Sequence, residues 1–293
     1  MPALVATHSG PFHADDVLSW ALLRTFLDPD AELLRSRDQD ALDKADVVFD
    51  VGSIFDPATR RFDHHQQDYT GTLSSAGMVL NWLEDEGRVS SELAAILRDR
   101  VVDYVDAVDN GLRTPDTGVP CFSQMVGVFG SGCSTLEDFD AAFRRAGDAA
   151  QNLVAGFATE LSERKAGEAA VVSAMEAAAA AGSNLMFLSR YHRWKHTYFA
   201  NGGANHVTEF VIHPGVDGRW RSVAIAPKPN SFAQKRSFPA SWGGLRDDAL
   251  SEVTGVPGSL FCHKNRFIAV FESRAGLLEA MARFDLIIGP VPV

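Results

Sequence analysis

Hydrophobic positions in the first 60 residues form short apolar runs separated by amphipathic segments, a pattern typical of strands joined by helices. Apolar side chains at positions 17, 18, 21, 22 and 26 follow an acidic start at helical spacing, which predicts a helix. Uninterrupted apolar runs are typical of strands buried in a parallel sheet. The expected strands are 4–7, 31–36 and 47–49, with a short polar helix at 39–45. This alternation predicts an α/β fold with a parallel sheet.

Helical periodicity dominates after residue 67, and strand patterns return after residue 184. The expected helices are 75–86, 92–108, 135–182 and 275–284, and the expected strands are 185–188, 207–212, 220–226, 260–262 and 267–271. We place a domain boundary near 180–185. Residues 1–182 are therefore expected to form a first domain with a helical connector, and residues 183–293 a smaller α/β domain.

The composition is that of an ordinary globular protein, with 46% hydrophobic and 22% charged residues. Its apolar stretches are shorter than the roughly 18–20 residues of a membrane span, and residues 1–5 lack the basic start of a secretory signal. The three cysteines, Cys121, Cys133 and Cys262, form no CxxC pair and are too few for a disulfide framework. We therefore expect a cytoplasmic protein that contacts no membrane.

Charge is distributed unequally along the chain. The formal net charge is −11, which argues against a protein that coats long nucleic acid. Residues 1–182 carry 14 Lys and Arg against 30 Asp and Glu, a net charge of −16, whereas residues 183–293 carry 13 against 8, a net charge of +5. An acidic half suits divalent cations and a basic half suits phosphates; the alternative is two solvated surfaces without a ligand.

Side chains that bind metals follow the first expected strand. His8, His13 and Asp15 lie in the segment 7–16, where Gly10 and Pro11 would turn the loop so that the three converge. Ligands of open parallel sheets sit outside the carboxyl ends of the strands, and this segment leaves such an end. The alternative for Asp15 is a capping role at the start of a helix.

Three further groups follow in the sequence. Asp50 closes the apolar run 47–49, where a turn residue is the alternative interpretation. His64 and His65 are adjacent; in a strand they would point to opposite faces, but in a loop both can face one point. Positions 103, 106 and 109 share one helical face, which would also suit a solvated acidic surface. The ordered recurrence of all four groups favours a common site.

This order of motifs resembles the DHH phosphoesterase superfamily, and more closely the MYG1 family, also called UPF0160. The resemblance rests on segments 7–16, 48–52, 61–66, 73–77, 105–111, 194–196, 242–247 and 257–258, so it spans nearly the whole chain. It implies a DHH-type N-terminal domain with a parallel sheet, a smaller α/β C-terminal domain, and an active site in the cleft between them.

The resemblance also implies roles for individual residues. His8, His13 and Asp15 match the first metal-binding motif, although a histidine replaces its first aspartate and the spacing is one residue longer. Asp50 matches the bridging carboxylate, and His64 and His65 match the third motif; the implied catalytic residues are Asp50, His64 and His65. Asp106 and Asp109 both remain candidates for the fourth metal ligand. The implied cofactors are two divalent cations, with Mn²⁺ favoured over Mg²⁺ or Zn²⁺ by the mixture of imidazole and carboxylate ligands.

The expected function is metal-dependent phosphodiester hydrolysis of the 3′–5′ exonuclease type on RNA or short oligonucleotides. The alternatives are hydrolysis of a small phosphoanhydride or nucleotide, and metal or nucleotide binding without catalysis. The Gly-Gly pair that usually follows a histidine near the C-terminus in the superfamily is missing from 263–270. Whether the chain forms a homodimer stays open. Candidates for substrate binding in the basic domain are Lys235, Arg236, Arg246, His263 and Lys264, with Lys228 and Arg266 as further cations.

Overall fold

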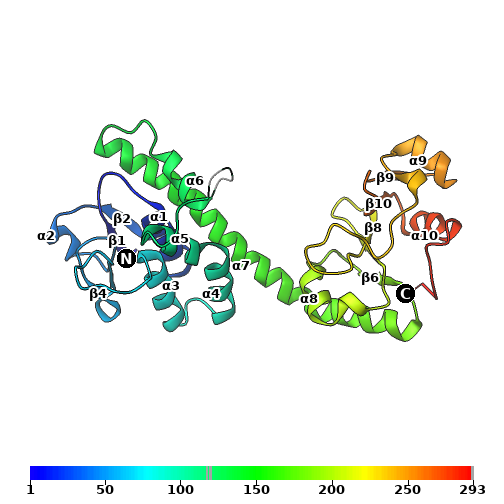
Figure 1. The fold of residues 1–293 in the computed structure, drawn as a ribbon, viewed down its shortest axis with the longest axis horizontal. Helices are drawn as coiled ribbons and strands as arrows, with labels where there is room; N and C mark the ends of the chain where they lie inside the picture. Colours follow the sequence, from blue (N-terminus) through cyan, green and yellow to red (C-terminus); the bar gives the residue numbers. More distant parts are fainter. Residues whose placement is uncertain (117, 119–120, 292–293) are drawn as a thin grey trace. The chain divides into compact units, whose positions relative to one another are not determined.

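The computed structural model describes residues 1–116, 118 and 121–291, which form two compact units, Met1–Thr159 and Glu160–Val293. Each unit contains its own five-stranded mixed sheet, and the long helix α7 (Leu136–Ala181) contributes residues to both (Figure 1). Among the described residues, no helix combines the length and apolar character that crossing a membrane would require.

The sheet of the first unit is parallel except at one edge. Its strand order is β2-β1-β3-β5-β4, and β4 pairs with β5 in the antiparallel sense. The predicted parallel sheet is therefore present but extended by a two-residue edge strand, because the short helix η1 (Pro57–Thr59) reverses the chain. The strands are β1 (Leu4–Thr7), β2 (Glu32–Arg35), β3 (Val47–Phe49), β4 (Phe55–Asp56) and β5 (Arg61–Phe62).

Helix α1 is buried from Ala14 to Leu23 and packs against α3, α5 and α6. Instead of one helix at 92–108, the chain forms α4, a π-helical turn η2 and α5. These helices are α1 (Ala14–Phe26), α2 (Gln39–Leu42), α3 (Ser75–Asp85), α4 (Ser91–Leu97), η2 (Arg98–Val102), α5 (Asp103–Asp109) and α6 (Phe122–Phe129).

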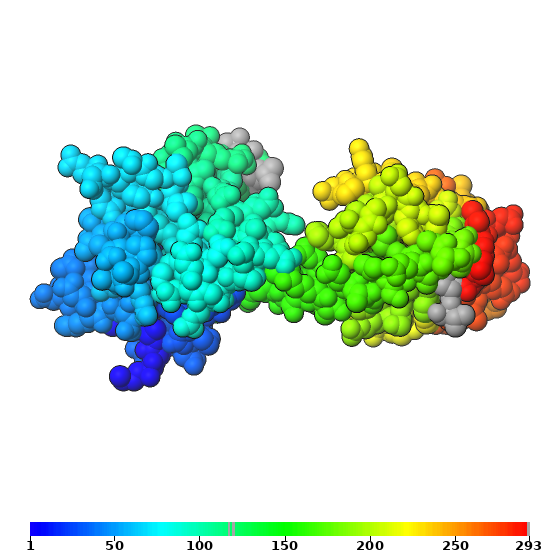
Figure 2. Space-filling view, turned by 90° about the horizontal axis from the view of Figure 1, so that it is seen from below, coloured from blue at the N-terminus to red at the C-terminus, as the bar shows by residue number. Residues whose placement is uncertain are grey.

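The second unit builds a sheet in the order β6-β7-β8-β10-β9 around an aromatic core that includes Phe210, Phe238, Trp242 and Phe271. Among the described strands of this second sheet, only β6 and β7 pair in the parallel sense. The loop around residues 226–236 projects from the surface of this unit (yellow in Figure 2). The strands are β6 (Leu185–Phe187), β7 (Phe210–Pro214), β8 (Trp220–Ala224), β9 (Ser259–Cys262) and β10 (Ile268–Phe271). The helices are α8 (Trp194–Ala200), η3 (Gly203–Asn205), η4 (Ala240–Trp242), α9 (Asp247–Thr254) and α10 (Arg274–Arg283).

Candidate metal centre

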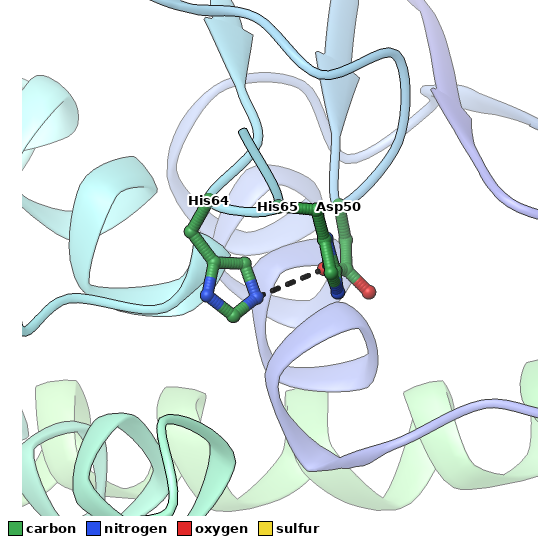
Figure 3. Close-up of side chains that lie close together, drawn as sticks. All are labelled: Asp50, His64 and His65. Carbon is green, nitrogen blue, oxygen red and sulfur yellow. Dashed lines mark ion pairs between the residues drawn. The ribbon is translucent and has the colours of Figure 1, made fainter. Parts of the chain in front are cut away.

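Acidic and imidazole side chains meet where three parallel strands of the first unit end. β1 leads into His8, β3 into Asp50, and β5 into the segment that carries His64 and His65. Because parallel strands end at one edge of the sheet, these loops are neighbours. Figure 3 shows the side chain of His64 directed toward Asp50, with His65 beside the same carboxylate.

The distances define a compact, buried cluster. His8 Nε2 lies 3.2 Å from Asp50 Oδ2 and 3.2 Å from Asp16 Oδ2. His64 Nε2 lies 3.4 Å from Asp50 Oδ1 and 3.6 Å from Asp15 Oδ2. Asp50 therefore stands between two imidazoles. The exposed fraction of its side chain is 2%, so bulk water cannot supply hydrogen bonds that the protein does not provide.

The backbone at Asp50 is unusual. Its φ is +55°, in the left-handed region that residues other than glycine rarely adopt, although Asp is among the side chains that tolerate it best. Its N–H donates to the carbonyl of Phe62, which ties the end of β3 to the end of β5. Residues held in this region cost of order 1 kcal/mol and concentrate at functional sites. The conformation turns the carboxylate into the cluster.

Several ligand atoms of the cluster have no hydrogen-bond partner. They are Asp15 Oδ1, Asp16 Oδ2, Asp50 Oδ1 and His64 Nε2, and all are buried. The ion-pair distances above do not satisfy the geometry of a hydrogen bond for these atoms. Leaving a buried charged group unsatisfied costs a protein several kcal/mol unless a ligand compensates. Convergent unsatisfied carboxylate and imidazole atoms fit a bound divalent cation.

Three groups of side chains have ligand atoms close enough to hold a metal ion. Within each group, the ligand atoms lie within 4.8 Å of one another. Two of the groups share Asp50. The groups are Asp50 with His64 and His65, His8 with Asp16 and Asp50, and His13 with Asp15 and Asp109. Imidazole nitrogen and carboxylate oxygen suit Mn²⁺, Mg²⁺ or Zn²⁺.

The protonation of the cluster follows from its crowding. Burial opposes a charged His64, but Asp109 and Asp50 outweigh it and raise the pKa of His64 to about 11. Burial likewise opposes a charged His8, but Asp16 and Asp50 raise its pKa to about 9. Burial, with the neighbouring charges of Asp50 and Asp109, holds the pKa of Asp15 well above its usual range. Without a cation, protons on the imidazoles partly neutralise the carboxylates.

Asp109 and Asp106, the two candidates for the fourth motif, lie in different surroundings. Asp109 Oδ2 is 3.1 Å from His64 Nε2, within the cluster. Asp106 Oδ1 instead accepts hydrogen bonds from Ser74 N, Ser74 Oγ and Gly77 N at the start of α3. A Cβ on Gly77 would collide with the Asp106 carboxylate, so this contact is close-packed. The structure thus places Asp109 in the cluster and Asp106 outside it.

Asp16 belongs to the cluster although the sequence analysis did not single it out. Its Oδ1 accepts from the backbone N–H of His13 and of Val17 at the start of α1, which leaves Oδ2 facing His8. Adjacent acidic residues at a helix start are ordinary helix-capping residues. The signal in the sequence is the pair Asp15–Asp16 itself. Asp16 caps the start of α1 with Oδ1, and both side chains also contact histidines of the cluster.

Asp63 is a second residue that the sequence analysis did not assign. Its Oδ1 lies 2.7 Å from His65 Nδ1, and its Oδ2 accepts from the backbone N–H of Ser53. A carboxylate only accepts, so Nδ1 of His65 donates and Nε2 remains available. The His65 side chain is 60% exposed, unlike the buried His64. Asp63 therefore orients an exposed imidazole at the edge of the cluster.

The cations predicted to bind substrate fall into two classes. Lys235 Nζ donates to Gly203 O at 2.7 Å, to His206 O at 2.8 Å and to Tyr198 Oη at 3.0 Å. Arg236 donates to Asp285 O and pairs with Glu209. Lys235 and Arg236 thus contact acceptors of their own unit, and their substrate-binding role stays a prediction.

The other predicted substrate-binding residues lie at the surface of the second unit. Arg246 and Lys264 are exposed, and His263 is partly buried in the turn between β9 and β10. A Gly-Gly pair does lie beside this turn, but it is Gly243–Gly244 rather than part of 263–270. A Cβ on Gly243 would approach Lys264 O to 3.2 Å, so the two backbones pass closely.

Comparison with known proteins places the chain among relatives of similar length. The profile of a family described as an uncharacterised protein family (UPF0160) matches residues 4–286. MYG1 protein of Chlamydia muridarum is 34% identical over 287 residues, which cover 96% of each chain. MYG1 exonuclease of Homo sapiens is 31% identical over an alignment 328 residues long, which covers 97% of this chain and 86% of the human one. The chain belongs to the MYG1 family (UPF0160).

Proposed function

We propose that this protein is a metal-dependent phosphodiesterase that removes nucleotides from the 3′ end of RNA or short oligonucleotides. The observation that carries the proposal is the buried cluster at the strand ends, where carboxylate and imidazole atoms converge without hydrogen-bond partners. Several relatives are named MYG1 exonuclease, which supports a nucleic acid as the substrate. The net charge of −16 over residues 1–182 favours short strands over long duplexes.

The cluster has enough ligands for two divalent cations, with Mn²⁺ favoured. Asp50 belongs to two of the three ligand groups, so it is the residue best placed to contact both ions. The remaining ligands would be His8 and Asp16 on one side and His64 on the other, with Asp15, His13 and Asp109 completing the site. Bound cations would neutralise charge that develops on phosphoryl oxygens during hydrolysis.

His65 is the residue best suited to act on the leaving group. Its Nδ1 is held by Asp63 and its side chain is exposed, so Nε2 is free to bond a phosphoryl oxygen or to donate a proton. Buried His64 faces Asp15, Asp50 and Asp109 with its Nε2 and is the better metal ligand of the two. The two neighbouring histidines would thus divide the roles of ligand and acid.

A substrate panel tests the proposal. The purified chain is freed of metal with EDTA and resupplied with Mn²⁺, Mg²⁺ or Zn²⁺. It is then offered single-stranded RNA and DNA 5-mers, a cyclic dinucleotide and pyrophosphate. We expect Mn²⁺-dependent release of mononucleotides from the linear strands, with a ladder of shortened products that retain a 5′ label. Hydrolysis of pyrophosphate without any strand shortening would replace the exonuclease assignment with that of a small-molecule hydrolase.

A further inference from the structure

A loop of the second unit presents an aromatic side chain entirely to solvent. Phe232 has a relative exposure of 100%. The loop is closed at its base by the hydrogen bond from Lys235 N to Ile225 O at 2.7 Å, and the contacts of the partly buried Lys235 ammonium fix that end. Figure 2 shows this part of the chain standing out from the surface. The phenyl ring at the tip of this anchored loop is therefore accessible for stacking.

The loop tip is tied to the turn between β9 and β10. The Gln234 side-chain amide donates to Phe232 O at 3.4 Å and to Asn265 O at 3.2 Å. The Ser237 hydroxyl donates to Gln234 Oε1, which fixes the orientation of that amide. Phe232 and the turn that carries Lys264 therefore belong to one surface.

Aromatic rings and cations alternate along the neighbouring edge. The Arg246 guanidinium lies 5.5 Å from the centroid of the Phe261 ring, and that ring lies 6.2 Å from His263. His263 lies 4.4 Å from Phe267, which is 37% exposed. Lys264, which follows His263, is also exposed on this edge and makes no ion pair within the described residues. We name this surface, with Phe232 and Lys228, the aromatic-basic surface.

We propose that the aromatic-basic surface binds single-stranded nucleic acid, with Phe232 stacking on a base and Lys228 and Lys264 bonding phosphates. A single strand repeats a flat base and an anionic phosphate, and surfaces that bind it combine aromatic rings with cations. A duplex hides its bases, so an exposed ring gains little from it. The net charge of +5 over residues 183–293 favours an anionic partner over a second copy of the same surface, which would be basic as well. The inference rests on the proposed function only for the identity of the substrate.

Binding is measured separately from hydrolysis to test this surface. The full chain in EDTA is titrated against a fluorescein-labelled single-stranded RNA 8-mer, and anisotropy gives the Kd. Phe232→Ala should weaken binding about tenfold, the loss expected when one base loses an aromatic partner. The matched control is Val216→Ala, which removes another fully exposed apolar side chain from the same unit and should leave Kd unchanged.

An abasic strand separates stacking from a change in the loop. Wild type and Phe232→Ala should bind an 8-mer that lacks bases equally, because neither can stack on it. Replacing both Lys228 and Lys264 by Gln should reduce the slope of log Kd against log salt by about 1.4, the value for two phosphates of a single strand. Lys195 is exposed on α8, outside the aromatic-basic surface. Lys195→Gln therefore controls for the effect of removing a positive charge elsewhere on the unit.

Each outcome decides the question. The proposal is overturned if wild type does not bind the strand, if Phe232→Ala binds it normally, or if the loss is equal on the abasic strand. A dimer that Phe232→Ala converts to a monomer, with unchanged RNA binding, would instead assign the surface to a second copy of the chain. If the wild type hydrolyses no strand but Phe232→Ala still weakens RNA binding, the surface is kept and the proposed exonuclease activity is rejected.

Discussion

The charged cluster at the strand ends of the first unit and the Lys235 ammonium of the second unit differ in how their hydrogen-bonding groups are satisfied. In the first unit, Asp50 and His64 are packed among other charges while ligand atoms of both lack hydrogen-bond partners. In the second unit, the half-buried Lys235 ammonium finds acceptors for its N–H groups within 3.0 Å. A folded protein normally satisfies the polar groups that it buries. The unsatisfied set therefore marks a place for a ligand, whereas the satisfied ammonium marks a structural anchor.

The same contrast separates two neighbours on one helix. Asp106 has three donors from the start of α3 and so stabilises the packing of α5 against α3. Asp109, one turn later, faces His64 instead. Identical side chains on one helical face thus have different tasks, and the available donors distinguish them.

Removing the shared carboxylate should have the largest effect. Asp50→Asn keeps the shape of the side chain but removes the charge that two cations would share, so we expect kcat to fall by about three orders of magnitude or more. Initial rates on an RNA 5-mer with saturating Mn²⁺ give the comparison. Asp103→Asn removes an exposed carboxylate from α5 and serves as the control. Turnover by Asp50→Asn within tenfold of wild type would mean that Asp50 is a turn residue.

Metal binding should appear as stability. At a free Mn²⁺ concentration of 100 times Kd, binding to the native state adds about 2.7 kcal/mol to the free energy of unfolding. The expected rise in Tm is several degrees over the EDTA-treated chain, measured by calorimetry. Asp109→Asn should reduce this rise, whereas Asp106→Asn should preserve it. Equal behaviour of the two variants would remove the distinction drawn from their hydrogen bonds.

Much of the fold follows from the apolar pattern, because its longer elements bury one continuous set of side chains. The strands 4–7 and 47–49 and the helix after Asp15 match β1, β3 and α1. The pattern missed β4 and β5, since two residues are too few to show an alternation. It also missed α6, α8 and α9, short helices whose formation depends on the packing around them.

Less of the site could be predicted from the sequence, because its chemistry depends on tertiary contacts. The order of motifs indicates that His8, Asp50 and His64 come together, as parallel strands end at one edge. The residues around Asp16 in the sequence do not indicate that it caps α1 with one oxygen and faces His8 with the other. Likewise, the sequence around Lys235 does not predict that its ammonium contacts carbonyls of a loop about 30 residues away in the chain.

Truncating the structural ammonium should lower stability. Lys235→Met removes the ammonium donor from the carbonyl of His206 and leaves the Gly203 carbonyl only the backbone N–H of His206. A buried acceptor that loses its donor costs about 1–3 kcal/mol. Because the site is only half-buried, we expect about 2 kcal/mol in urea unfolding. Lys228→Met is the exposed control, and its effect should stay within about 0.5 kcal/mol. Equal stability of the two variants would favour the predicted substrate-binding role of Lys235 instead.

The smallest expected effect distinguishes the two neighbouring histidines. Asp63→Asn replaces the carboxylate that holds His65 Nδ1 with a neutral amide, which weakens control of the imidazole tautomer and its orientation. We expect kcat on an RNA 5-mer to fall about tenfold while the Mn²⁺-induced rise in Tm is unchanged, because His65 acts on the substrate. If His65 is instead a metal ligand, loss of its supporting carboxylate weakens Mn²⁺ affinity by about tenfold or more. Titrating Mn²⁺ into both proteins separates these cases, since a lower affinity together with normal kcat at saturating metal would move His65 from proton donor to ligand.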